Sequence, residues 1–100
     1  MRVVFTEIFA RQLETQISYI AKKGSVDAAR RMKDRVLNHV FAFLSANPEA
    51  SRFIQEHAIY ESVIPNTNYV LFYRLEEPDI LRILALFHDR QQRSDFGSDI

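Results

Sequence analysis

The hydrophobic pattern of this chain changes its period at Pro48, from helical spacing to extended spacing. Before this proline, two sets of apolar residues recur at steps of three or four, which places each set on one stripe of a helix. The two sets are Phe9, Leu13, Ile17 and Ile20, followed by Ala29, Met32, Val36, Val40 and Phe43. Because proline disfavours the helical conformation in the residue before it, the second helix is expected to end at Asn47. The pattern therefore predicts two helices followed by a sheet.

Capping residues set the expected ends of the two helices. A short β-prone run at residues 3–5 precedes Thr6, which is a suitable N-cap for the first helix. That helix should run to about Lys22, with Gly24 as a left-handed terminator. Ser25 is placed to cap the second helix, so the two helices should form an antiparallel hairpin.

After Pro48, runs of β-branched and aromatic residues alternate with turn-forming residues. Strands are expected within residues 52–54, 57–64, 69–75 and 80–88, with turns at residues 65–68 and 76–79. The predicted fold class is α+β: a helical hairpin packed on a curved antiparallel β-sheet, in the order β-α-α-β-β-β, with three or four strands after the helices. One hundred residues suffice for a single domain, expected at residues 1–96, with a frayed tail at residues 97–100.

The composition excludes several classes of protein. Hydrophobic residues make up 47% of the chain and cysteine is absent, which indicates a folded interior without disulfides, a thiolate nucleophile or cysteine-bound zinc. No apolar run approaches the roughly 20 residues that cross a bilayer, and no secretory signal is recognised, so we expect a cytoplasmic protein without a membrane partner. His39, His57 and His88 lie on different predicted elements, so neither a metal site nor a cofactor is expected.

Charge is distributed unevenly along the chain, although its net value is zero. Residues 1–47 contain eight basic and four acidic residues, whereas residues 48–100 contain five basic and nine acidic residues. A protein that binds mainly to a phosphate backbone usually has a basic excess, which the C-terminal half lacks. The run of Arg30, Arg31, Lys33 and Arg35 is compatible with a nucleic-acid patch, but a solvated helix face is the commoner interpretation.

Three segments carry a resemblance to a known family. They are LETQISYIA at residues 13–21, NYVLFYRL at residues 68–75 and ILRILALFHDRQQ at residues 80–92. In their order they resemble the RelE/ParE superfamily of bacterial toxins over about residues 1–93, and the strand ending in His-x-Arg is closer to ParE-like members. The resemblance implies the toxin of a type II toxin–antitoxin system, which forms a hetero-oligomer with a cognate antitoxin whose disordered segment folds onto it.

The superfamily contains two mechanisms on one fold, which the fold alone does not separate. RelE-like members cut mRNA on the ribosome with a cluster of lysines and arginines plus a tyrosine, whereas ParE-like members inhibit DNA gyrase. Residues 57–62 contain no lysine, and Glu61 lies near the position of an expected arginine, which favours DNA gyrase as the target and a non-enzymatic protein. The alternative is a RelE-like mRNA interferase that uses Arg74, Arg82, His88 and Arg90 as phosphate and acid–base groups. A further alternative is an inactive relative that only binds the antitoxin.

The pairing of the last two strands selects the expected partner-binding residues. If Leu75 lies opposite Ile80, then Tyr73 lies opposite Arg82, and one face of the hairpin is mixed polar and aromatic. Together with Arg90, this face is expected to form a concave partner-binding groove. Its residues are Tyr69, Tyr73, Arg82 and His88. The opposite face, expected to carry the helices, comprises Val70, Phe72, Leu81, Ile83, Ala85 and Phe87. The alternative is that the tyrosines and the arginine stem only cover a half-exposed sheet.

Overall fold

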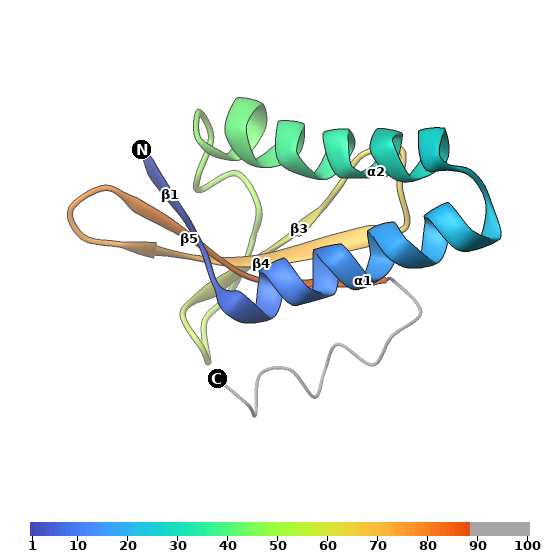
Figure 1. The fold of residues 1–100 in the computed structure, drawn as a ribbon. Coiled ribbons are helices and arrows are strands. Elements are labelled where there is room, and N and C mark those ends of the chain that lie inside the picture. The colour runs from blue at the N-terminus through green and yellow to red at the C-terminus, as the bar shows by residue number, and fades with distance from the viewer. Residues whose placement is uncertain (89–100) are drawn as a thin grey trace.

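The computed structural model describes residues 1–88, in which two helices lie across one face of a five-stranded sheet (Figure 1). The elements are β1 (Arg2–Phe5), α1 (Glu7–Lys23), α2 (Val26–Asn38), a π-helical segment η1 (His39–Leu44), β2 (Arg52–Ile54), β3 (Ile59–Val63), β4 (Tyr69–Glu76) and β5 (Ile80–His88). The predicted α+β fold class and helical hairpin are confirmed. The expected domain boundary at residue 96 and the tail after it lie outside the described residues.

The strand order in the sheet is β1-β5-β4-β3-β2. Strands β2 to β5 are joined by short turns, which make each neighbouring pair antiparallel. Strand β1 is connected to the others through two helices, so no hairpin fixes its direction, and it pairs with β5 in parallel. The sheet is therefore mixed, whereas the sequence pattern predicts a purely antiparallel one.

The helix caps match the sequence pattern at the N-termini but not at Gly24. The hydroxyl of Thr6 accepts the backbone N–H of Phe9 at 3.1 Å, and the hydroxyl of Ser25 caps α2 in the same way. Gly24 has a φ of −117°, so the expectation of a left-handed terminator is wrong. Its N–H donates to the carbonyl of Ile20 at 2.8 Å, and a Cβ on Gly24 would lie 3.2 Å from that oxygen. Glycine is therefore favoured here by a close approach of the backbone.

The helix that begins at Val26 widens into the π-helical segment η1, which changes the side chains that face the core. Ser45 donates its N–H to the carbonyl of Val40, five residues earlier, at 3.1 Å. Because the wider turn contains one more residue, the residue that faces the core after Val40 is four positions later and not three. Leu44 is consequently fully buried, while Phe43 is 42% exposed. The predicted apolar stripe is confirmed as far as Val40, its last member is wrong, and the helix ends earlier than Asn47.

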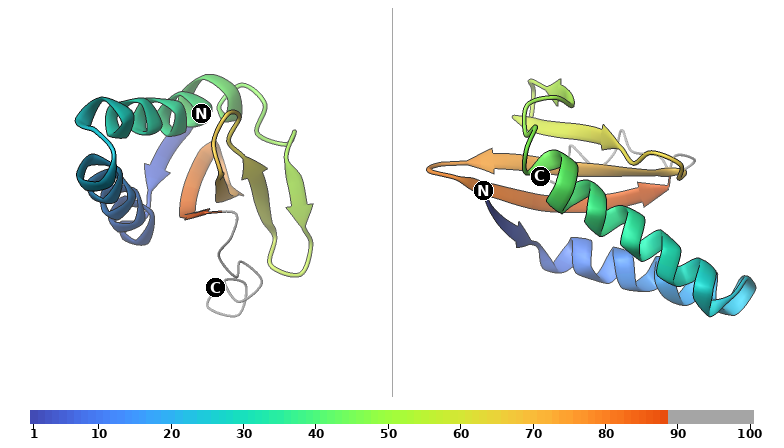
Figure 2. Two further views of the ribbon diagram at one scale, coloured as in Figure 1. Left: turned by 90° about the vertical axis from the view of Figure 1, so that its right-hand side faces the viewer. Right: turned by 90° about the horizontal axis from the view of Figure 1, so that it is seen from above.

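The main core lies between the helices and the sheet, and Figure 2 shows that both helices cover the same face. Its buried residues are Phe9, Leu13, Met32, Val36, Val40, Leu44, Ile64, Tyr69, Leu71, Tyr73, Leu81, Ile83 and Leu86. A second buried cluster, formed by Ile59, Val70, Phe72 and Ala85, belongs to the opposite face of the sheet. Both faces of the central strands are thus apolar, which explains why β4 is buried at each of its first five residues.

Candidate functional site

A bulge in β5 determines which residues share a face of the sheet. The pairs that flank it are Tyr73–Ile83 and Phe72–Ala85, with Leu84 left over on β5. The pairs nearer the turn are Arg74–Arg82, Leu75–Leu81 and Glu76–Ile80. The predicted pairing of Leu75 with Ile80 is wrong because the strands continue to Glu76 and the turn is shorter. A slip of one residue moves side chains to the other face, so Tyr73 and Arg82 are on opposite faces.

The predicted grouping of residues by face is therefore wrong for both sets. Tyr69 and Tyr73 belong to the core beneath the helices, together with Leu81 and Ile83. Val70, Phe72, Ala85 and Phe87, which were expected to carry the helices, belong to the opposite cluster. The mixed face that was to form a concave groove does not exist as a single surface.

Helix α1 supplies side-chain partners for backbone groups near the bulge. Thr6 donates its hydroxyl proton to the carbonyl of Leu84 at 2.9 Å. Leu86 donates its N–H to Oε1 of Gln12 at 2.7 Å. Buried backbone groups without partners are costly, so these two contacts stabilise the irregular strand and fix α1 on it.

Tyr69 and Tyr73 connect the sheet to the elements that cover it. Tyr73 is completely buried, and its hydroxyl donates to the carbonyl of Pro48 at 2.7 Å. Tyr69 is 8% exposed, and its hydroxyl donates to Oε1 of Gln16 at 2.9 Å. Burial raises the pKa of both hydroxyls, so both remain protonated donors at neutral pH. Their positions give them a structural role within the described residues.

Arg82 lies near the β4–β5 turn and is engaged with an acidic neighbour. Its Nε–H donates to Oε2 of Glu76 at 2.9 Å, and about a third of each side chain is exposed. This hydrogen bond lowers the pKa of Glu76 and raises the pKa of Arg82, with the positive charge of Arg74 also lowering the pKa of Glu76. Two of the four proposed nuclease residues, Arg74 and Arg82, are thus neighbours on one face.

His88 lies at the opposite end of β5 from Arg82. Their partners on β4, Arg74 and Tyr69, are five residues apart, because the bulge at Leu84 absorbs one residue of β5. The separation along the sheet is therefore about 17 Å at roughly 3.4 Å per residue. The ring of His88 lies edge-on to the ring of Tyr69 with centroids 5.5 Å apart, on the helix side of the sheet. Arg90 lies outside the described residues. The structure therefore does not bring Arg74, Arg82 and His88 together into one site.

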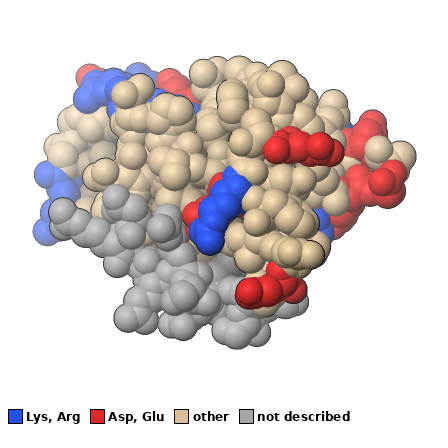
Figure 3. Space-filling model, turned by 180° about the vertical axis from the view of Figure 1, so that it is seen from behind, with Lys and Arg blue, Asp and Glu red and all other residues tan. Residues whose placement is uncertain are grey.

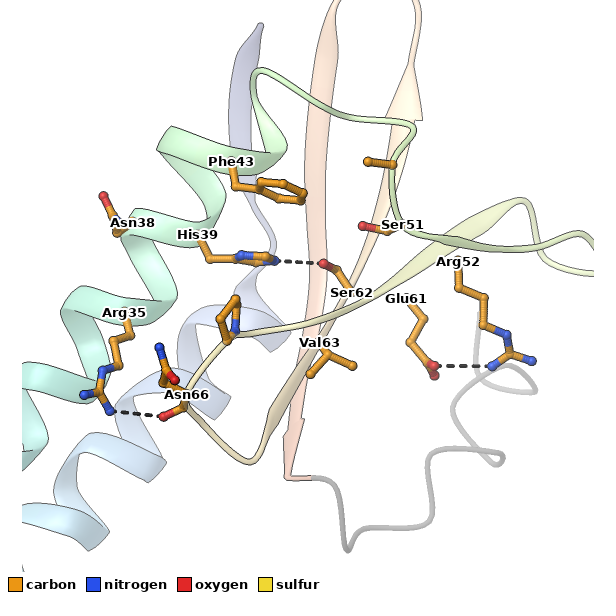
Figure 4. Close-up of a pocket in the computed structure, with 12 residues that line it drawn as sticks. Arg35, Asn38, His39, Phe43, Ser51, Arg52, Glu61, Ser62, Val63 and Asn66 are labelled. Atoms are coloured by element: carbon orange, nitrogen blue, oxygen red, sulfur yellow. Dashed lines mark hydrogen bonds and ion pairs between the residues drawn. The ribbon is translucent and has the colours of Figure 1, made fainter.

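A cleft that the sequence pattern did not predict opens between η1 and strand β3 (Figure 4). It has a volume of about 610 Å³. His39 and Ser62 form its floor, with Nε2 and Oγ hydrogen-bonded at 2.8 Å, and the ring of Phe43 stacks on His39 with centroids 5.2 Å apart. Tyr60, Ser62 and Ile64 are alternate residues of β3 and the segment after it, and they face the helices. A serine among them is the feature of the sequence that could have revealed the cleft, since a buried polar side chain needs a hydrogen-bond partner.

Charged groups surround the mouth of this cleft. Arg52 and Glu61 form an ion pair at 3.3 Å, in which Glu61 is mostly buried and Arg52 is mostly exposed. Arg35 donates from Nη1 to the carbonyl of Asn66 at 3.1 Å and has no carboxylate partner among residues 1–88. Burial lowers the pKa of His39, so this ring is neutral at physiological pH. The cleft therefore has an excess positive charge, which comes from Arg35.

His39 should make the stability of the protein depend on pH. Burial holds its pKa in the folded state below the ordinary value of 6.5, so the unfolded state takes up the proton first as the pH falls through 6.5. The free energy of unfolding should then decrease on acidification. Urea unfolding at about pH 7.5 and about pH 5.5 should show a smaller difference for His39→Gln than for the wild type. An equal difference in the two proteins would contradict this assignment.

The two halves of the chain place opposite charges at opposite ends of the molecule (Figure 3). Glu76, Glu77 and Asp79 lie at the β4–β5 hairpin. Lys22 and Lys23 lie where α1 turns into α2. The turn between α1 and α2 is therefore basic, whereas the β4–β5 turn carries three carboxylates next to Arg74 and Arg82.

The described part of the chain has neither a candidate metal site nor a candidate membrane-spanning helix. Within residues 1–88, no group of three or more histidine, aspartate and glutamate side chains is arranged to hold a metal ion. In the same residues, no helix combines the length and the hydrophobicity that spanning a bilayer requires.

Comparison with known proteins places the fold. A structure described as the chromosomal ParDE TA system from P. aeruginosa matches with a TM-score of 0.76 and 15% identity, over 88% of this chain and 95% of that one. The intact RelBE toxin–antitoxin complex of E. coli matches with a TM-score of 0.54 and 12% identity, over 90% of this chain and 98% of that one. A search of proteins with curated functions gives no significant match. The profile of the ParE toxin of the type II toxin–antitoxin system parDE matches residues 3–93, and the chain therefore belongs to the ParE toxin family.

Proposed function

We propose that this protein is the toxin of a type II toxin–antitoxin pair, that it inhibits DNA gyrase without cutting RNA, and that a cognate antitoxin neutralises it. Membership of the ParE toxin family supports the toxin role. The observation that carries the choice of mechanism is the separation of Arg74 and Arg82 from His88, at opposite ends and on opposite faces of the last hairpin.

This separation weighs against an mRNA interferase that uses these residues. Cleavage at a ribose 2′-hydroxyl requires an acid–base group and phosphate-binding cations around one phosphate, within hydrogen-bond reach of it. His88 is about 17 Å along the sheet from Arg82, and Arg82 is paired with Glu76. The described residues therefore offer the RelE-like mechanism no assembled set of these side chains.

The surface of the toxin offers the antitoxin an apolar contact next to the helical hairpin. Phe5, Ile8 and Phe41 are 39%, 57% and 54% exposed, respectively. Phe5 lies edge-on to Phe41, with ring centroids 5.9 Å apart, so residues from β1 and η1 form one cluster. Exposed apolar clusters on small proteins commonly mark partner contacts. An amphipathic antitoxin segment that orders on binding would bury this cluster, in keeping with a contact that spans several elements.

Induced expression in the absence of the antitoxin separates the two mechanisms in the cell. We expect division to stop, the DNA-damage response to begin and gyrase to be trapped on DNA, while primer extension shows intact transcripts. Co-expression of the antitoxin should restore growth and serves as the control. Codon-dependent cleavage of mRNA within minutes, without DNA damage, would contradict the proposal in favour of an interferase. Unimpaired growth would indicate an inactive relative.

A further inference from the structure

Strand β3 has an open edge at the cleft. Its pairing with β2 covers Ile59, Tyr60 and Glu61 and stops where β2 begins, at Arg52. Val63 continues the strand beyond that point and is 64% exposed. Within residues 1–88, neither its N–H nor its carbonyl forms a hydrogen bond with β2 or with any group outside the β3–β4 ladder.

The direction of the backbone groups follows from the ladder on the other side of β3. Ile64 donates its N–H to the carbonyl of Tyr69 on the β4 side, at 3.0 Å. Hydrogen-bonding groups alternate in direction along an antiparallel strand, so those of Val63 point away from β4. Val63 therefore presents one donor and one acceptor to a chain at the edge of the sheet. Such an edge is a template for an additional strand.

The cleft lies where the side chains of an added strand would point. Side chains alternate between the two faces of a strand, so the two residues that flank the one opposite Val63 would face the helix side, whichever way the segment runs. One of them would lie next to Ser62, close to His39 and Phe43, and the other next to Ile64, on the side of Arg35 and Asn66. The cleft thus fits two side chains that are two residues apart in an extended segment.

The lining of the cleft indicates what these two side chains are. Phe43 is 42% exposed and offers an aromatic surface beside the neutral His39–Ser62 pair, which suits an apolar side chain. Arg35 has no carboxylate partner within residues 1–88, which suits an acidic side chain. Both preferences describe an extended peptide with an acidic and an apolar residue in alternate positions.

We propose that an extended segment of the antitoxin adds to this edge as a strand beside β3, with a carboxylate on Arg35 and an apolar side chain against Phe43. The proposal rests on the proposed function, which supplies the antitoxin. Backbone hydrogen bonds to Val63 provide part of the affinity, and the two cleft positions provide the specificity. A strand at this site also covers the exposed edge, which otherwise favours pairing with other chains.

Amide hydrogen exchange measured by NMR on the full-length toxin tests the strand directly. The probe is the purified cognate antitoxin, compared with the toxin alone. The amide of Val63 exchanges readily in the free toxin and should be protected at least about 100-fold in the complex, because it becomes hydrogen-bonded. Unchanged exchange at Val63 in a complex that does form would overturn the strand addition. If the wild-type toxin forms no complex, the proposed function itself fails.

Titration calorimetry with charge-reversal variants tests the side-chain contact. Arg35→Glu should weaken antitoxin affinity at least about tenfold, because it replaces the cation of the cleft with an anion. Lys33→Glu makes the same change of charge on the same helix at a residue that does not line the cleft, and should change affinity less than about twofold. Equal effects of the two variants would contradict the contact with Arg35. Protection of Val63 that grows with the concentration of the toxin alone would assign the edge to a second copy and overturn the proposal.

Discussion

Replacing Tyr73 with alanine is expected to lower the free energy of unfolding by about 3–5 kcal/mol. The side chain is fully buried between the sheet and the helices, and its removal leaves a large cavity as well as an unpaired carbonyl at Pro48. Domains of this size are stabilised by about 5–15 kcal/mol in total, so the variant should unfold at a much lower urea concentration than the wild type. Urea denaturation followed by circular dichroism measures the difference.

Tyr73→Phe is the matched control for this prediction. It retains the ring in the core and removes only the hydroxyl that donates to Pro48, so it should cost about 1–2 kcal/mol. If Tyr73→Ala were as stable as the wild type, the residue would lie on an open surface, as the sequence-based pairing of Tyr73 with Arg82 assumed. Loss of antitoxin binding in Tyr73→Ala would therefore report unfolding and not a lost contact.

Leu44→Ala is expected to destabilise the protein by about 2–5 kcal/mol, because Leu44 is fully buried at the end of η1. Phe43→Ala should cost at most about 1 kcal/mol, because this ring is 42% exposed and stacks on His39 at the surface of the cleft. The comparison is sharp because the two residues are adjacent and the larger side chain has the smaller effect. Thermal or urea unfolding of both variants decides it. A larger loss for Phe43→Ala would contradict the π-helical register.

The sequence pattern predicts the elements well because their signals are local. The apolar stripes of α1 and α2, the caps at Thr6 and Ser25 and the strand at residues 80–88 all follow from spacing within a few residues. The parallel pairing of β1 with β5 depends on residues at opposite ends of the described chain. No local pattern encodes that contact. The sequence pattern therefore predicted an antiparallel sheet, although β1 runs parallel to β5.

The candidate site was harder to predict because it depends on shifts of a single residue. The bulge at Leu84 and the π-helical turn at η1 each shift a series of side chains by one position. The bulge moves Ala85 and Phe87 to the face opposite Leu81 and Ile83, and the π-helical turn places His39 and Phe43 at the cleft. A third shift of one residue, at the β4–β5 turn, separates Tyr73 from Arg82. Ser62 is the one local signal of that cleft, since it interrupts the helix-facing series of β3.

The proposed mechanism rests on where the basic residues lie. Arg74 and Arg82 lie together beside Glu76, while His88 lies at the other end of β5, so these side chains do not meet around one phosphate. This arrangement, together with membership of the ParE toxin family, is the basis of the proposal that the protein acts by binding.

A supercoiling assay with purified DNA gyrase tests this account most directly. The purified toxin should inhibit supercoiling of relaxed plasmid in proportion to its concentration and increase the cleaved DNA held by gyrase. Adding the cognate antitoxin before the enzyme should restore supercoiling. In parallel, translating ribosomes treated with the same toxin should retain intact mRNA. Full supercoiling activity at a large molar excess of folded toxin, together with cleavage of ribosome-bound mRNA, would contradict the account.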